Sequence, residues 1–201
     1  EIKMQMAFYF DQTRCTGCYT CYIACKEWHD IPAYSVQWLR IQETESGKYP
    51  DVFMSCTVSP CYHCVNPSCA EVCPTGCITK RGQDGIVVVN REECLGKEAC
   101  GQCLGACPYG AIQFRNKPDA KMEKCDFCLE RLEEGRQPAC VSSCPVRALD
   151  SGDIEELKVK YGKYGVVKTG PGLTSDKKNR PAFVIGVKYA PGPVSACCFA
   201  N

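Results

Sequence analysis

The sequence predicts an α+β fold of short strands and helices that metal clusters, rather than a large hydrophobic core, hold together. Of its 201 residues, 20 are cysteine. Leu, Ile, Val and Phe supply 40 residues, about 20 %, which is close to the limit below which a protein buries too little apolar surface to fold. One pattern also recurs along the chain, namely a group of cysteines, Cys-Pro, a turn and a short strand. A chain with so little core needs disulfides or metal centres as additional cross-links.

Sixteen of the cysteines form four groups of four, which we call motifs one to four. The cysteines of the first three motifs are separated by two, two and three residues, by two, four and three, and by five, two and three. The fourth motif is a Cys-x2-Cys pair followed, after eleven residues, by Cys-x3-Cys. Bacterial ferredoxins hold [4Fe–4S] clusters with such spacings, and the last cysteine of a motif binds the other cluster. The motif cysteines are Cys15, Cys18, Cys21 and Cys25; Cys61, Cys64, Cys69 and Cys73; Cys94, Cys100, Cys103 and Cys107; and Cys125, Cys128, Cys140 and Cys144.

Two other uses of the cysteines fit less well. A disulfide framework is typical of short secreted chains, whereas this chain is long and begins without an apolar signal region. Structural zinc sites usually combine two Cys-x2-Cys pairs, often with histidine, and only His29 and His63 are present. Iron–sulfur clusters explain the groups of four, the proline that follows three of the motifs and the internal repeat.

The elements of the first half follow from local composition. The aromatic residues 7–10 predict a strand, and residues 18–28 continue from motif one as a short helix. Alternating apolar residues predict a strand over 35–41 within an otherwise irregular stretch. Residues 43–50 are polar and predict a loop.

The second half repeats short elements between the motifs. Residues 79–90 predict a hairpin, and residues 111–114 predict a strand after the second Cys-Pro. Residues 129–139 predict a short helix, and a further helix is expected to begin at Asp153 as its N-cap. A last strand is expected over 182–187, after a basic, glycine-rich loop.

The order and spacing of the four motifs resemble the iron–sulfur (beta) subunit of the dimethyl sulfoxide reductase family of molybdenum/tungsten oxidoreductases. Similar subunits serve polysulfide, tetrathionate and arsenate reductases and some formate dehydrogenases. The resemblance covers residues 7–150. Its most specific stretches are Cys15-Thr16-Gly17-Cys18, Cys73-Pro74-Thr75-Gly76, Cys107-Pro108-Tyr109-Gly110-Ala111 and Glu134-Gly135-Arg136-Gln137-Pro138-Ala139-Cys140-Val141.

The resemblance implies two interleaved ferredoxin-like units, each with two clusters. Residues 1–50 and 115–150 would form one unit, residues 51–114 a nested unit, and residues 151–201 a C-terminal extension that docks a partner. Each cluster would take three ligands from one motif and the fourth from its paired motif, and electrons would pass from set 1, nearest the catalytic partner, to set 4. The implied ligands are Cys15, Cys18, Cys21 and Cys144 (set 1); Cys125, Cys128, Cys140 and Cys25 (set 2); Cys61, Cys64, Cys69 and Cys107 (set 3); and Cys94, Cys100, Cys103 and Cys73 (set 4).

The sequence departs from the family pattern in two places. Five residues separate Cys94 from Cys100 where the family usually has two, so we expect a bulged loop there. Lys26 follows Cys25 where the other motifs have proline.

Several residues lie outside the motif pattern. We expect Cys56 and Cys77 to be buried packing thiols, and Cys197 and Cys198 to be a plain tail pair. His63 could tune a cluster or carry protons, but a surface histidine is the favoured interpretation. For the two tryptophans, Trp28 and Trp38, packing is slightly favoured over partner docking. Three lysines near motifs could either raise the reduction potential of a cluster or simply be solvated, namely Lys26, Lys121 and Lys124.

The composition restricts where the protein acts. The net charge of +1 offers no electrostatic surface for nucleic acid. No apolar run is long enough to span a membrane, and no signal region precedes motif one. We therefore expect a cytoplasmic protein or one exported with a signal-bearing partner, with membrane association only through a partner.

The sequence shows no catalytic residues. Clusters with four cysteine ligands are saturated, so they transfer electrons and do not bind substrate. We therefore expect an electron-transfer subunit with four [4Fe–4S] clusters, which connects a molybdenum or tungsten pterin catalytic subunit with a second partner such as a quinone-linked membrane anchor. The pterin would be present only on the catalytic partner. The alternative is a freestanding polyferredoxin, against which the C-terminal extension from residue 151 to 201 argues.

Overall fold

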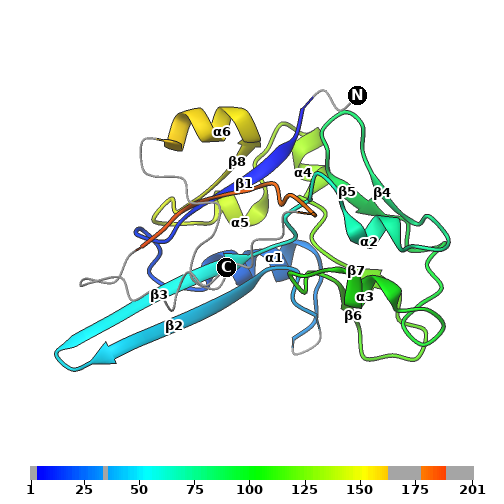
Figure 1. Ribbon diagram of the computed structural model, residues 1–201, viewed down its shortest axis with the longest axis horizontal. Helices are drawn as coiled ribbons and strands as arrows, with labels where there is room; N and C mark the ends of the chain where they lie inside the picture. The colour runs from blue at the N-terminus through cyan, green and yellow to red at the C-terminus, as the bar shows by residue number, and fades with distance from the viewer. Residues whose placement is uncertain (1–3, 34–35, 163–177, 189–201) are drawn as a thin grey trace.

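A computed structural model describes residues 4–33, 36–162 and 178–188 as a mixed α/β structure of short elements (Figure 1). No helix in these ranges is both long enough and apolar enough to cross a membrane. The strands are β1 (Met6–Asp11), β2 (Arg40–Lys48), β3 (Asp51–Ser59), β4 (Ile78–Lys80), β5 (Val87–Val89), β6 (Gln113–Phe114), β7 (Met122–Glu123), β8 (Leu149–Asp153) and β9 (Phe183–Gly186). The helices are α1 (Thr20–Trp28), α2 (Ser68–Glu71), α3 (Gln102–Ala106), α4 (Leu129–Glu133), α5 (Ala139–Ser142) and α6 (Ile154–Tyr161).

The largest sheet joins the start of the chain to segments far along it. Its order is β8-β1-β9, with β8 antiparallel and β9 parallel to the central β1. Phe8 pairs with Ser151 on one side and with Phe183 on the other. Because β1 has neighbours on both edges and packing on both faces, residues 7–10 are all buried. This pairing brings motif one close to the end of motif four, and the expected strand over 7–10 is confirmed.

Helix α6 covers the same sheet. Asp153 is its N-cap, because its side chain accepts hydrogen bonds from the backbone N–H groups of Glu155 and Glu156, as expected. Leu157 is buried against the sheet, and the ring of Tyr161 stacks on Tyr9 with 3.5 Å between the ring centroids. The helix therefore anchors the chain that leaves motif four.

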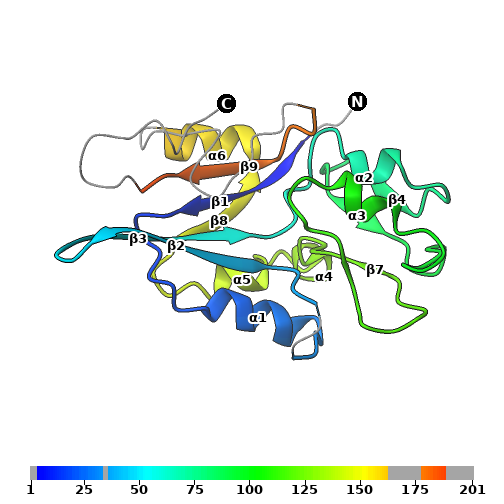
Figure 2. The same cartoon turned by 60° about the horizontal axis from the view of Figure 1, so that its bottom comes forward.

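The long hairpin β2–β3 was not expected from the sequence. The prediction of a strand over 35–41 and a loop over 43–50 is wrong, since β2 begins at Arg40 and pairs with β3 in register from Arg40↔Ser59 to Lys48↔Asp51. Both views show the hairpin projecting away from the rest of the chain (Figures 1 and 2). Its distal part is exposed on both faces, so no apolar alternation marks it in the sequence.

The remaining elements surround motifs two, three and four. The expected hairpin over 79–90 is confirmed as β4–β5, and the strand expected over 111–114 is limited to β6, which pairs with β7. The single helix expected over 129–139 is instead two short helices, α4 and α5, because Gly135 adopts a φ of +71° and Pro138 precedes α5. Elements α2, α3 and β4 to β7 gather at one end of the molecule in both views (Figures 1 and 2).

A row of three rings joins the segments of motifs two and four to β1. Phe127 stacks on Phe8 with centroids 4.1 Å apart, and His63 meets the edge of Phe127 at 5.3 Å. The interpretation of His63 as a surface residue is therefore wrong, because its exposed fraction is only 1 %. Its Nδ1 accepts a hydrogen bond of 3.0 Å from the Val87 N–H. Burial and the nearby lysine charges lower the pKa of His63 well below its usual value, so the ring is neutral.

Candidate iron–sulfur sites

Each motif contains the same left-handed turn. The second residue after the first cysteine has a positive φ in all four motifs, which tightens the loop between the first two cysteines. The four residues are Gly17 (φ 69°), His63 (42°), Gly96 (93°) and Phe127 (67°). In motif three the additional residues follow Gly96 and form a turn in which the Cys100 N–H donates to the Gly96 carbonyl at 3.1 Å. This turn is the bulge expected between Cys94 and Cys100.

A second shared turn follows each Cys-Pro. The third residue after the cysteine has a positive φ and donates its N–H to the carbonyl of that cysteine at 3.2 Å. These residues are Gly76 after Cys73, Gly110 after Cys107 and Arg147 after Cys144. In two of the three turns the next N–H donates to the cysteine sulfur, from Ala111 to Cys107 Sγ at 3.4 Å and from Ala148 to Cys144 Sγ at 3.2 Å. Hydrogen bonds of this kind stabilise a thiolate ligand.

Three of the four implied ligand sets each line one cavity. The cysteines of set 1, those of set 3 and those of set 4 each line a cavity of about 20 Å³. Each cavity therefore receives three thiols from one motif and one from a motif distant in the sequence. The structure brings these side chains together, while their role as cluster ligands stays a prediction.

The thiols of set 2 lie deeper in the protein. Cys25, Cys125, Cys128 and Cys140 are all buried, and three of them, Cys25, Cys125 and Cys140, belong to the main hydrophobic core. Burial, followed by the charge of Cys128, raises the pKa of Cys25 to about 12. The pKa values of Cys125 and Cys140 are raised well above the usual range by burial and then by neighbouring cysteines, Cys25 for Cys125 and Cys128 for Cys140. The structure therefore also brings the four members of set 2 together.

The chemistry of the donors fits iron–sulfur clusters. Burial raises the pKa of Cys21, Cys64 and Cys69 to about 12, so these thiols are protonated at neutral pH unless a cation replaces the proton. Iron binding would release those protons. Four sulfur donors around each site suit iron and sulfide, because soft thiolates select such centres.

Charged and ring groups surround set 2. His29 Nε2 lies 3.3 Å from Cys128 Sγ and 3.6 Å from the Asp126 carboxylate. Lys124 is buried, and its ammonium donates to the carbonyls of Val87 and Cys125. Since the exposed fraction of Lys124 is only 3 %, the interpretation of this residue as a solvated lysine is wrong. A buried cation so close to Cys125 favours electron-rich states of an adjacent cluster.

The two tryptophans differ in burial. Trp38 is buried, and its indole N–H donates to the carboxylate of Glu123 at 3.2 Å, which confirms a packing role. Trp28 is partly exposed and lies under the guanidinium groups of Arg131 and Arg136, at 4.6 and 5.3 Å from its ring. Such cation–π contacts fix the end of α1 beside α4.

Two cysteines outside the motifs were expected to be buried, and both are. Cys56 lies beside set 1, since a Cβ on Gly17 would come within 3.0 Å of its sulfur. Cys77 lines the set 4 cavity, with its sulfur 3.4 Å from that of Cys73. Their contact with the ligand sets could not be read from the sequence. Cys197 and Cys198 lie outside the described residues.

Comparison with known proteins gives concordant results. Residues 52–154 match the family model of the 4Fe-4S dicluster domain. The chain is 42 % identical over 183 residues to a subunit of the anaerobic dimethyl sulfoxide reductase of Escherichia coli, with 87 % of this chain and 86 % of the relative covered. It is 35 % identical to the thiosulfate reductase electron transfer subunit PhsB of Salmonella typhi (80 % and 82 % covered). It is 36 % identical to the protein NrfC of Escherichia coli (73 % and 64 % covered).

Three observations point to the same family. The cysteine motifs converge on shared cavities, the domain model matches, and the relatives align over most of both chains. The chain belongs to the family of 4Fe-4S dicluster proteins that comprises the iron–sulfur subunits of dimethyl sulfoxide reductase and related oxidoreductases.

Proposed function

We propose that this chain relays electrons through four [4Fe–4S] clusters, one at each of sets 1 to 4, between a molybdenum or tungsten pterin catalytic subunit and a second partner such as a quinone-linked membrane anchor. The observation that carries the proposal is the continuity of the four sets. Each set is linked to the next by a shared helix, by a charge interaction between two cysteines or by a shared hydrophobic cluster.

The links between the sets run in one order. Helix α1 carries Cys21 of set 1 and Cys25 of set 2, one turn apart. Cys61 of set 3 contributes to the raised pKa of Cys125 of set 2, so these two sulfurs are electrostatic neighbours. Cysteines of sets 3 and 4 also pack in one hydrophobic cluster. Because electron transfer slows steeply with distance, a row of adjacent sites favours a relay over independent centres.

Contacts between helices of paired motifs support two ferredoxin-like units. Helix α1 of motif one packs beside α5 of motif four, and α2 of motif two packs beside α3 of motif three. In each pair, a helix of one motif carries or adjoins the cysteine that would be the fourth ligand of the set built on the other motif. We therefore also propose that residues 1–50 and 115–150 form one ferredoxin-like unit and that residues 51–114 form a second unit nested within it. The extension from residue 151 onwards is proposed to dock a partner.

The chain itself would do no substrate chemistry. A cluster with four cysteine ligands has no open position on iron, and its role is to accept and donate single electrons. The surrounding residues hold it, shield it from water through burial of the thiols, and supply nearby positive charge from Lys124 and Lys121. The Lys121 ammonium donates to the carbonyl of Cys94, a member of set 4, at 2.8 Å.

Iron and sulfide analysis with EPR of the anaerobically purified chain tests the proposal. We expect four irons for each of four clusters, and an EPR-silent oxidised state. Cys100→Ser should convert one cluster to a [3Fe–4S] centre, with a new signal in the oxidised protein, or should lose that cluster. Cys56→Ser is the matched control and should keep the full iron content. An oxidised Cys100→Ser protein that stays silent with all its iron would contradict the assignment of set 4.

Purification with the neighbouring subunits separates the proposal from a freestanding polyferredoxin. A subunit should co-purify with a pterin-containing polypeptide and should accept electrons from, or donate them to, that complex alone. A monomer that exchanges electrons equally with unrelated reductases would instead support the soluble carrier.

A further inference from the structure

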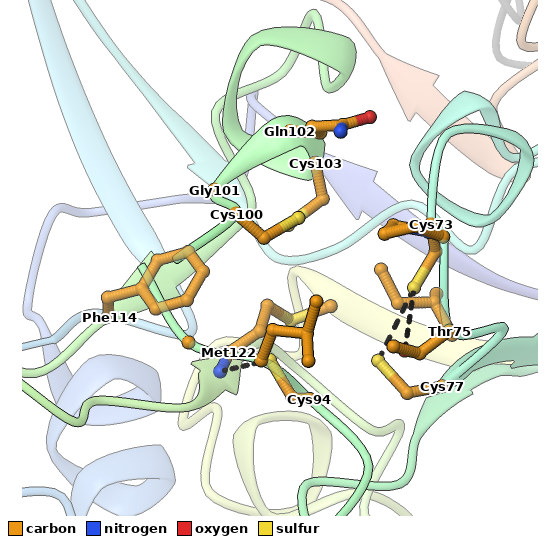
Figure 3. Close-up of a pocket in the computed structure, with 14 residues that line it drawn as sticks. Cys73, Thr75, Cys77, Cys94, Cys100, Gly101, Gln102, Cys103, Phe114 and Met122 are labelled. Carbon is orange, nitrogen blue, oxygen red and sulfur yellow. Dashed lines mark hydrogen bonds between the residues drawn. The ribbon is translucent and has the colours of Figure 1, made fainter. Parts of the chain in front are cut away.

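The cavity of set 4 contains a fifth thiol. In addition to Cys73, Cys94, Cys100 and Cys103, Cys77 lines it (Figure 3). The sulfurs of Cys77 and Cys73 are 3.4 Å apart and hydrogen-bonded, and Figure 3 shows both directed to the same side of the cavity. Among the described cavities of sets 1, 3 and 4, only this one is lined by more cysteines than a cluster needs.

The internal repeat shows that Cys77 replaces a small residue. Cys77 is the fourth residue after the cysteine of its Cys-Pro turn, and the equivalent residues in the other two turns are Ala111 and Ala148. Both alanines are buried, with exposed fractions of 4 % and 1 %. The shared turn therefore needs only a small buried side chain at this position. The thiol of Cys77 is an addition that the geometry of the turn does not require.

The position of Cys77 is set by a sheet rather than by a loop. Cys77 directly precedes β4, and its carbonyl accepts a hydrogen bond of 2.8 Å from the Asn90 N–H, just beyond β5. Its exposed fraction is 3 %. Cys73, in contrast, lies in the turn between α2 and β4 and is only partly buried. The fifth sulfur is therefore held beside the Cys73 sulfur by a more rigid and better-buried backbone.

We propose that Cys77 is a reserve ligand of set 4, which can replace Cys73 on the iron that Cys73 would hold. The exchange is balanced within the pair of sulfurs. The proton of the Cys77 thiol moves to Cys73 along their hydrogen bond, the bond between iron and Cys73 breaks, and a bond between iron and Cys77 forms. No oxidant or reductant is needed, and the charge of the site does not change. This inference rests on the cluster proposed for set 4.

The reserve role would matter most where the ordinary ligand is easiest to lose. Cys73 is partly exposed, and the additional residues between Cys94 and Cys100 enlarge another loop that lines the same cavity. A second thiol behind Cys73 would keep the site saturated when the outer ligand dissociates. Without it, the iron would have an open position that water or oxygen could reach.

The test compares Cys73→Ala with Cys144→Ala in the full chain, purified anaerobically. Alanine is chosen because serine could itself bind iron. Cys144 occupies the equivalent turn of set 1, where the fourth residue after it is Ala148 instead of a cysteine. We expect Cys73→Ala to retain wild-type iron and sulfide and an EPR-silent oxidised state. Cys144→Ala should lose one cluster or show a [3Fe–4S] signal, and so should the double variant Cys73→Ala/Cys77→Ala.

Three outcomes would overturn the inference. Loss of the cluster or of the folded chain in Cys73→Ala, to the same extent as in Cys144→Ala, would show that Cys77 does not bind. Full iron in the double variant would show that neither sulfur is required. Loss in Cys77→Ala alone would make Cys77 the ordinary ligand. A wild-type chain that lacks the fourth cluster would instead contradict the proposed function, so the two failures are distinguishable.

The transfer of the pair to another site provides a positive test. Ala148 lines the set 1 cavity, so Ala148→Cys places a thiol where Cys77 lies in set 4. We expect Cys144→Ala/Ala148→Cys to recover the iron and sulfide that Cys144→Ala loses. Recovery would support the reserve role, whereas an unchanged deficit would show that this place in the turn cannot supply a ligand.

Discussion

The Nε2 atom of His29 lies 3.3 Å from the sulfur of Cys128, although 99 residues separate the two in the sequence. His29 is the C-cap residue of α1, and Cys128 belongs to motif four, so the contact joins the two motifs proposed to share one unit. The ring of His29 is held by Trp38 at 4.5 Å between centroids. The sequence offers His29 only as an extra zinc ligand, because its contact with Cys128 depends on how distant segments pack.

His29→Phe should lower the midpoint potential of one cluster. A thiolate that binds iron can only accept a hydrogen bond, so His29 would donate from Nε2 and stabilise the more negative reduced state. A tenfold preference for that state corresponds to about 59 mV for one electron. An EPR-monitored redox titration measures the shift. His29→Gln retains an N–H donor and should lie closer to wild type, and identical potentials in His29→Phe and wild type would contradict the role.

Gly17→Ala should destabilise the loop of set 1. Gly17 has a φ of +69°, and an added Cβ would lie 3.0 Å from the Cys56 sulfur. The left-handed conformation alone costs an alanine roughly 1–2 kcal/mol. We expect a lower melting temperature and faster loss of iron to a chelator. Gly162→Ala is the matched control, because nothing lies near an added Cβ there. Equal effects of the two substitutions would show that the turn is not under constraint.

Glu123→Gln should destabilise the region around β7. The carboxylate has an exposed fraction of 4 %, accepts a hydrogen bond from the Arg115 guanidinium at 2.6 Å and also accepts one from Trp38. Loss of a charged partner from such a buried network costs about 1–3 kcal/mol. Thermal denaturation of the reduced, anaerobic protein measures the difference. Glu133→Gln is the control, since its carboxylate is 69 % exposed and lies 3.8 Å from the Arg81 guanidinium, so that this ion pair should contribute little.

Removal of iron should unfold most of the chain. Cysteines of all four sets belong to the two hydrophobic clusters that pack around them, and Leu, Ile, Val and Phe make up only about 20 % of the 201 residues. We expect a chelator under reducing conditions to abolish the cooperative thermal transition and much of the far-ultraviolet circular dichroism. Iron and sulfide added back should restore both. An iron-free chain that keeps a sharp transition would show that the hydrophobic core suffices.

The sequence alone determined the features that depend on local spacing. The cysteine motifs, the Cys-Pro turns, the β4–β5 hairpin and the Asp153 cap all rest on residues close together in the chain, whose geometry neighbouring backbone dihedrals restrict. The resemblance added ligand sets 1 to 4, whose members the structure brings together in three cavities and one buried group. Their ligation, and the boundaries of the two units, stay predictions.

Only the tertiary structure decided the contacts between distant segments. The β2–β3 hairpin is solvated on both faces along its distal part, so its strands carry no apolar signal there and become visible only through their pairing. His63 and Lys124 look like surface residues by type, yet the packing of β5 and Phe127 buries them. Cys77 looked like a packing thiol because its distance from Cys73 depends on how the turn meets β4. Spacing fixes which residues can form a loop, whereas burial and proximity depend on what the rest of the chain places against it.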